Sequence, residues 1–179
     1  HTTPWGVVAR NLDVTVSKPS ADYRGQAKFS NGTVTFQQYV PFRVDMDSTF
    51  KLDGGLVRFD RLDLDSEGAK SHLTGVVDLG NFPEQTYQVQ SHIDFPTQKR
   101  IWFAKDRFTV SGEGDFTGTF HMFKETMPDG RTRTGRQLTG AFTSPLAGVD
   151  AWRFANLRGQ VRWVPETLEI TDATTNAYS

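Results

Sequence analysis

Apolar and polar side chains alternate along much of this 179-residue chain, and this period of two restricts the fold more than any other feature. Between residues 41 and 53, Phe42, Val44 and Met46 occupy every second position, and Phe50 and Leu52 continue the apolar series. The positions between them are polar or charged. Because successive side chains of a β-strand point to opposite faces of a sheet, the segment is predicted to be a strand with one dry face and one charged face.

The same alternation predicts further strands in simple succession. Residues 69–79 and 86–95 are expected to form a hairpin around a turn at 80–84, and a long strand at 107–122 returns through 137–144. Weaker patterns predict strands at 7–17, 23–30, 33–40, 56–65, 157–164 and 168–174. One short helix at most is predicted, at 97–106 with Thr97 as its N-cap. About a dozen consecutive strands favour an all-β fold, an extended antiparallel meander.

The composition fits strands and excludes several kinds of protein. The 14 Phe and 4 Trp suit pleated strands, and the 16 Gly suit tight turns. The chain has 20 Lys and Arg against 21 Asp and Glu, so its net charge of −1 gives no general attraction for nucleic acid. The absence of cysteine excludes disulfides and Cys-ligated metals. No secretory signal is evident, and the opening at His1 resembles the middle of a longer protein, so a targeting segment is expected outside this chain.

Acidic side chains occur in patterns that a metal site or an enzyme could use. Asp63, Asp65 and Glu67 resemble the start of a calcium loop, but Thr74 stands where such a loop requires a late glutamate. A solvated strand face that ends in a turn is the favoured interpretation. The pairs Asp45/Asp47 and Glu113/Asp115 lie about 7 Å apart on predicted strands, a separation that a glycoside hydrolase tolerates. Their faces also carry Lys, Arg and Thr like any solvated β-surface, so a glycosidase-like enzyme is only a third hypothesis, and no catalytic residue is predicted.

His72 and His92 are expected to oppose each other if the predicted hairpin turns around residues 81–83. Two adjacent imidazoles could hold zinc or copper. No third ligand is evident, since Asp94 would face Lys70. An exposed cross-strand pair without metal is therefore favoured, no metal or cofactor is predicted, and metal binding by these two histidines is left open.

Strand starts bounded by glycine recur through the chain. Gly55-Leu-Val-Arg-Phe59 and Gly159-Gln-Val-Arg-Trp163 each begin with a glycine that is expected to lie in a turn, followed by valine and an aromatic residue. Leu73-Thr-Gly-Val-Val-Asp-Leu79 lies between them. Together with the succession of strands over nearly the whole chain, these elements resemble the AsmA/TamB superfamily of Gram-negative bacteria. The resemblance implies that residues 1–179 form a single β-groove segment that comes from a longer repeat array.

The resemblance implies both a fold and a role. Proteins of this superfamily form a long, U-shaped, taco-like groove with an apolar interior, and serve as conduits for phospholipid between the inner and outer membranes. Some members are linked instead to the assembly of outer-membrane proteins. For this chain the resemblance implies a periplasmic location, an inner-membrane anchor in the full-length protein, and contact with both membranes through parts outside this chain. Neighbouring repeats of the same polypeptide would pair with its edge strands.

The first hypothesis is therefore a non-catalytic envelope segment whose apolar groove shields phospholipid acyl chains. A chain of roughly 16 carbons carries about 12 kcal/mol of apolar burial, at about 0.8 kcal/mol per methylene. Gly112, Gly114 and Gly118 on the apolar face would widen the groove or let it curve. The predicted lining residues are Phe42, Val44, Met46, Phe50, Leu73, Val77, Val89, Ile93, Phe95, Phe108, Val110, Phe116, Phe120 and Phe142.

A closed β-sandwich is the second hypothesis, because the same apolar positions would fill its core. Its function would be that of a binding module of the carbohydrate-binding or adhesin type. Strand order separates the two architectures: a simple meander with open edges indicates the groove, whereas Greek-key crossovers indicate the sandwich.

Overall fold

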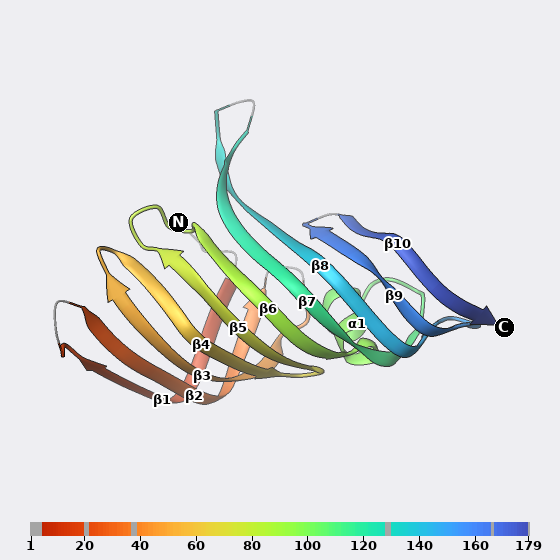
Figure 1. Ribbon diagram of the computed structural model, residues 1–179, viewed down its shortest axis with the longest axis horizontal. Helices are drawn as coiled ribbons and strands as arrows, with labels where there is room; N and C mark the ends of the chain where they lie inside the picture. Colours follow the sequence, from red (N-terminus) through yellow and green to blue (C-terminus); the bar gives the residue numbers. More distant parts are fainter. Residues whose placement is uncertain (1–4, 20–21, 37–38, 128–129, 166, 179) are drawn as a thin grey trace.

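The chain folds into one antiparallel β-sheet of ten strands, which pair in the order of the sequence (Figure 1). This computed structural model describes residues 5–19, 22–36, 39–127, 130–165 and 167–178. One short helix, α1 (Phe95–Trp102), separates the sixth strand from the seventh. The strands are β1 (Trp5–Ser17), β2 (Tyr23–Phe36), β3 (Phe42–Asp53), β4 (Leu56–Ser66), β5 (Ala69–Asp78), β6 (Gln85–Asp94), β7 (Val110–Thr126), β8 (Thr132–Val149), β9 (Trp152–Val164) and β10 (Thr167–Tyr178).

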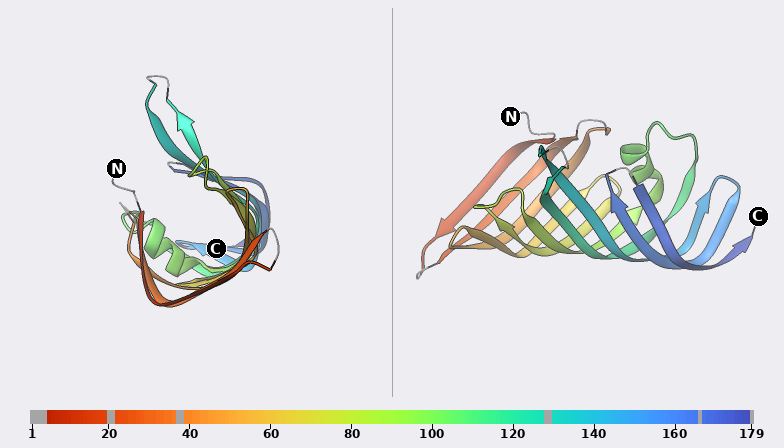
Figure 2. Two further views of the ribbon diagram at one scale, coloured as in Figure 1. Left: turned by 90° about the vertical axis from the view of Figure 1, so that its left-hand side faces the viewer. Right: turned by 90° about the horizontal axis from the view of Figure 1, so that it is seen from above.

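The sheet is curled into an open, U-shaped groove (Figure 2). Each long strand bends through the U-shaped cross-section, so the axis of the groove runs across the strands. The two edge strands of the sheet, β1 and β10, therefore lie at the two ends of the groove. The consecutive strand order confirms the predicted meander with open edges. It contradicts the Greek-key order of the β-sandwich alternative, and the described residues form no second sheet.

Residues in the left-handed backbone region bend the outer strands. Asn11 and Asn31 have φ angles of 53° and 55°, and the pairing of β1 with β2 shifts register beside them. Asp172, with φ of 51°, lies in a similar register shift between β9 and β10. Asn and Asp tolerate this region better than other non-glycine residues. A bulge of this kind bends a strand and increases its twist, which lets these strands follow the U.

The sequence Asn31-Gly32 explains why there are ten strands and not about a dozen. The predicted strands at 23–30 and 33–40 are one strand in the structure, β2, which continues through both residues as a bulge. The prediction failed because Asn-Gly is also a strong turn signal; positions 37–38 lie outside the described residues. Gly159 likewise lies within β9 and not in a turn, whereas Gly55, with φ of 87°, does occupy one.

Two continuous rows of side chains cross the sheet on the concave face. In the leucine row, the ten successive partners are Val14, Ala27, Ser48, Leu62, Leu73, Val89, Gly118, Gly140, Val161 and Ile170. In the aromatic row they are Val16, Gly25, Phe50, Phe59, Gly75, Tyr87, Phe120, Leu138, Trp163 and Leu168. Cross-strand pairs on one face are the unit of sheet stabilisation, so these rows tie every strand to its neighbours.

Glycines on the concave face lie beneath aromatic rings. The Phe116 ring covers Gly118 and Gly140, and the Phe95 ring covers Gly114. A Cβ atom at Gly118 would lie 2.6 Å from Phe116 Cζ, so only glycine fits under the ring. Gly114 and Gly118 therefore do not widen the groove, the first of the two predicted roles, because rings occupy the space above them. Curvature, the second predicted role, applies to Gly112 and Gly114: the φ of Gly112 is 96°, and the pairing of β7 with β8 shifts register between Glu113 and Asp115.

Helix α1 begins two residues earlier than predicted. Asp94 and not Thr97 is the N-cap, since Asp94 Oδ1 accepts a hydrogen bond of 2.9 Å from the Thr97 backbone N–H. Phe95, predicted to end a strand, is the first helical residue. Pro96 follows it in the first turn, where its missing N–H is tolerated. The helix ends at Trp102 and lies on the concave side of the sheet (Figure 2).

Replacing Gly118 with alanine is expected to lower the free energy of unfolding by about 1–3 kcal/mol, the usual cost of overpacking. The added methyl group would collide with the Phe116 ring and the Thr139 carbonyl oxygen. Urea denaturation followed by circular dichroism measures the change. Gly6→Ala in β1 is the matched control, because nothing lies within 4 Å of its Cβ position. Equal midpoints for the two variants would contradict a structural role for the ring–glycine contacts.

Candidate functional site

The concave face carries the apolar side chains of the sheet. Five of its buried members form one cluster from β4 to β7: Leu62, Leu73, Tyr87, Val89 and Phe116. Around them lie apolar side chains that remain partly exposed: Met46, Phe59, Leu64, Val77, Ile93, Phe120, Leu138, Phe142 and Val161. The face is therefore a continuous apolar surface whose central side chains are buried and whose surrounding side chains are partly open to solvent.

The ring contacts of the aromatic row make this surface continuous from strand to strand. The Phe59 ring lies 6.0 Å from Phe50 and 6.2 Å from Tyr87, measured between ring centroids. Tyr87 in turn stacks on Phe120 at 6.5 Å. Gly75 stands between Phe59 and Tyr87 in the row, and its missing side chain lets the two rings meet over β5.

Polar groups on the concave face are satisfied within the sheet. The hydroxyl of the fully buried Ser48 donates to the Ala27 carbonyl at 3.0 Å, and the Ser71 and Ser91 hydroxyls bond each other at 2.8 Å. Burial raises the pKa of the Tyr87 phenol to about 12, and its hydroxyl donates to Gln85 Oε1 at 3.1 Å. Among the described residues, no buried side-chain nitrogen or oxygen lacks a partner. The polar groups on the floor of the groove therefore need few hydrogen bonds from water.

The accessible surface shows how open the molecule is. The chain of 20.1 kDa exposes 11355 Å². A compact monomer of that mass exposes about 8,700 Å² on the usual scaling with mass. The excess surface is expected of one sheet whose concave face is not covered by a second layer.

Helix α1 and its aromatic residues bridge the two arms of the groove at one place. The Trp102 ring lies 5.5 Å from Phe42 of β3 and 5.5 Å from Trp163 of β9. These strands are six positions apart, about 29 Å along a flat sheet. Because the strands slant and bend, the start of β3 and the end of β9 instead face each other across Trp102. Arg136 of β8 also bridges the arms, donating to the Tyr39 hydroxyl at 2.9 Å. We call this bridge of Tyr39, Phe42, Trp102, Arg136 and Trp163 the clasp.

Most predicted lining residues are on the concave face. Val44, Leu73, Val89 and Phe116 are buried there. Met46, Val77, Ile93, Phe120 and Phe142 pack against the cluster, and Phe50 contacts Phe59. The remaining four lie near the helix or the start of β7: Phe42 contacts Trp102, Phe95 is in α1, Phe108 contacts Phe103, and Val110 begins β7.

Several groove residues were absent from the predicted set. Phe59, Leu62 and Leu64 all belong to β4, but a register shift between Phe59 and Leu62 changes the parity of the apolar positions there. The period of two breaks at that point, which weakens the strand signal. Tyr87, Leu138 and Trp163 do follow the alternation of their strands, so the sequence pattern could have included them.

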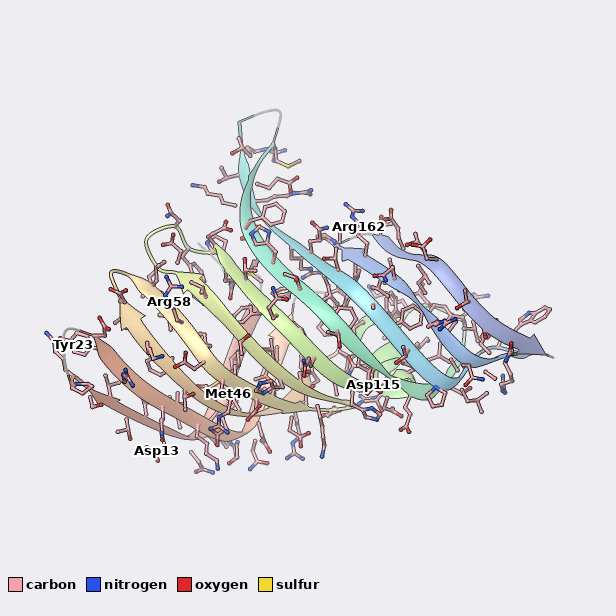
Figure 3. All side chains as sticks on the ribbon, in the orientation of Figure 1. Asp13, Tyr23, Met46, Arg58, Asp115 and Arg162 are labelled. Carbon is pink, nitrogen blue, oxygen red and sulfur yellow. The ribbon has the colours of Figure 1, made fainter. Side chains whose placement is uncertain are left out.

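The outer face is charged, and Figure 3 turns it towards the viewer, with Asp13, Arg58, Asp115 and Arg162 labelled. The Arg61 guanidinium contacts the carboxylates of both Asp47 and Asp63. Lys51 pairs with Asp60 at 2.8 Å, and Arg162 pairs with Glu169 at 3.2 Å. These exposed pairs contribute little stability individually. Their effect is to give the back of the sheet a solvated surface.

The two histidines do not face each other as predicted. His92 lies opposite Lys70, and His72 lies opposite Gln90, because the hairpin register differs by two residues from the expected one. Each imidazole instead bonds a carboxylate on its other neighbouring strand. His72 Nδ1 lies 2.7 Å from Asp63 Oδ1, and His92 Nδ1 lies 2.9 Å from Asp115 Oδ1.

The acidic residues that resemble a calcium loop are paired with basic side chains and not with one another. Asp63 and Asp65 lie in β4, and the hydrogen bond from His72 and the Arg61 charge lower the pKa of Asp63. Glu67 follows in a turn, where it pairs with Arg100 and accepts the Arg43 backbone N–H. Within the described ranges, no three metal-ligating side chains come together. This arrangement is the predicted solvated strand face that ends in a turn.

Comparison with protein-family models, with curated proteins and with solved structures finds no match for this chain. In the part of the chain that the structure describes, no helix has the length and apolarity needed to cross a membrane.

The imidazole of His92 provides a test of the outer-face geometry. In its charged form the imidazole donates hydrogen bonds to the carboxylates of Asp115 and then Glu113, and these bonds raise the pKa of His92 above 6.5. Its contribution to stability is therefore fully present below about pH 6.5 and is lost as the pH rises through the folded-state pKa. Asp115→Asn should lower the pKa of His92, as measured by NMR titration of the ring proton. Glu125→Gln, which removes a carboxylate paired with Arg133, is the control and should leave that pKa unchanged. An identical titration in the Asp115→Asn variant would contradict the contact.

Proposed function

We propose that this chain shields the acyl chains of phospholipid in its concave groove and catalyses no reaction. The main observation in support of the proposal is the aromatic row, which continues from β1 to β10 on the partly exposed face of one open sheet. An ordinary soluble domain buries such a row against a second layer. Here the second layer would be the ligand.

The dimensions of the groove suit this ligand. Nine spacings between ten strands, at about 4.8 Å each, make the groove about 43 Å long. The hydrocarbon of one bilayer leaflet is about 15 Å thick, so one extended acyl chain would cover roughly three strands. An acyl chain has no polar atoms that need partners, and the Ser48, Ser71 and Ser91 hydroxyls on the floor are already satisfied.

The division between the two faces also supports the proposal. Headgroups would remain at the open mouth of the U in water, while the acyl chains contact the floor. The charged outer face keeps the back of the sheet solvated. Transport between inner and outer membranes, a periplasmic location and membrane contacts through parts outside this chain belong to the same proposal, as does pairing with neighbouring repeats of the same polypeptide.

A scaffold for the assembly of outer-membrane proteins is the alternative role. It would use the open edges of the sheet, because an unpaired edge can accept an added strand. A change on the groove floor therefore separates the two roles: it should impair lipid shielding and leave strand addition intact.

Binding of a phosphatidylethanolamine with one short NBD-labelled acyl chain tests the proposal directly. The fluorescence should rise when the label leaves water for the groove. Phe59→Gln places a polar amide in the aromatic row and should weaken binding about tenfold or more, since burying such a ring is worth about 1.5–3 kcal/mol. Arg58→Gln is the matched control on the outer face of the same strand and should bind as the unsubstituted chain does.

A second variant at the same position controls for a loss of binding caused by misfolding. Phe59→Leu keeps the position apolar and should retain most of the binding, and circular dichroism should show the same strand content in all three variants. Native mass spectrometry of the purified chain should also detect bound phospholipid. No fluorescence change with the unsubstituted chain, or equal binding by Phe59→Gln and Arg58→Gln, would contradict the proposal.

A further inference from the structure

The two edges of the sheet carry the open ends of both apolar rows. The leucine row begins at Val14 and ends at Ile170, which are 51 % and 55 % exposed, whereas its inner members Leu62 and Leu73 are 8 % exposed. The aromatic row begins at Val16 and ends at Leu168, which are 53 % and 46 % exposed. A row member inside the sheet is covered by neighbours on both sides. The end members have a neighbour on one side only.

The edges match each other in strand direction and length. Neighbouring strands alternate in direction across the ten-stranded sheet, so β10 runs opposite to β1. If β10 of one molecule lay beside β1 of another, the pair would be antiparallel and the alternation would continue without a break. The two edges have 13 and 12 residues. Each presents unpaired backbone N–H and C=O groups, which are a template for another strand.

One register continues both rows at once. When Ile170 of β10 lies opposite Val14 of a second β1, Leu168 lies opposite Val16 of that strand. Both contacts are then apolar pairs on the concave face. On the outer face the same register sets Glu169 against Thr15 and Thr171 against Asp13, so no like charges stand directly opposite each other.

The bends of the two edges coincide in this register. Asn11 bends β1 and Asp172 bends β10, both through a left-handed residue beside a register shift. With Ile170 opposite Val14, Asn11 is one residue away from the position opposite Asp172. The alternative is a head-to-head pair, in which the β1 strands of two copies lie side by side with Val14 opposite Val16. In that pair the two Asn11 bends would not lie opposite each other. Coincident bends let the U-shaped cross-section continue across the junction.

We infer that a second copy of this chain docks head to tail, with β10 of one copy pairing with β1 of the next and Ile170 opposite Val14. The groove of one copy then continues into the groove of the other. Because the contact is heterologous, each added copy leaves one edge free, and the contact can repeat beyond a dimer. The inference depends only on the edges and holds whether or not the groove binds lipid. A neighbouring repeat of the same polypeptide would use the same two edges, so that pairing and the docking of a second copy exclude each other.

Disulfide trapping tests the register. Because the chain has no native cysteine, only the introduced cysteines can form cross-links. The double variant Val14→Cys/Ile170→Cys should form a ladder of dimers, trimers and longer species on oxidation, seen on a non-reducing gel. The control Val16→Cys/Ile170→Cys offsets the sulfurs by two residues and should cross-link at least tenfold less. Val14→Cys alone should stay monomeric. Equal cross-linking by both double variants, or dimers from Val14→Cys alone, would overturn the head-to-tail register.

Sedimentation of the chain without cysteines provides the second test. The unsubstituted chain should associate as its concentration rises from micromolar to hundreds of micromolar. Val14→Lys/Ile170→Lys places a charge on each edge and should remain monomeric, with a circular dichroism spectrum equal to that of the unsubstituted chain. The outer-face variant Arg58→Gln should associate normally. A monomer at every concentration for the unsubstituted chain would refute the inference.

Discussion

Cross-strand contacts between apolar side chains on one face hold this sheet together. A flat pair of strands is marginally stable in water, and a sheet requires an apolar face to become stable. Here Tyr87 contacts Phe59 and Phe120 across its neighbouring strands, and Phe116 covers the glycines at positions 118 and 140. The rings bury one another and the glycines beneath them. The sheet can therefore curl without a second protein sheet on its concave face.

The curl follows from where the strands bend. Asn11, Asn31 and Asp172 adopt left-handed backbone conformations within long strands, and the register shifts beside them. Once bent and slanted, strands that are distant in the sheet face each other, which brings Trp102 between Phe42 and Trp163. The clasp thus narrows the groove at one cross-section and leaves its other parts open. A charged outer face and a dry inner face result from the same alternation of side chains.

The sequence allowed the faces and the strand order to be predicted, because the period of two survives wherever strands are regular. Val44, Leu73, Val89 and Phe116 were placed on the buried face for this reason. The prediction failed where the backbone leaves the regular strand. Asn31-Gly32 suggested a turn and forms a bulge, and the parity change between Phe59 and Leu62 takes Leu62 and Leu64 out of the alternation that Val57 and Phe59 follow. The clasp depends on the slant of the whole sheet, which no local pattern contains. The expected pairing of His72 with His92 failed because it depended on the length of the turn between β5 and β6, which the sequence pattern did not give.

The proposed shielding of phospholipid requires that the apolar face remain open to an acyl chain. Val76 and Val77 are adjacent in β5 and point to opposite faces, with Val77 packed against the groove cluster. Methyl NMR of the chain mixed with a phospholipid that carries a nitroxide spin label on its acyl chain compares the two directly. If acyl chains bind in the groove, the methyl groups of Val77 should show strong line broadening and those of Val76 little. This difference is the expected result of the proposal. Equal broadening of both residues, or none at either, would contradict it.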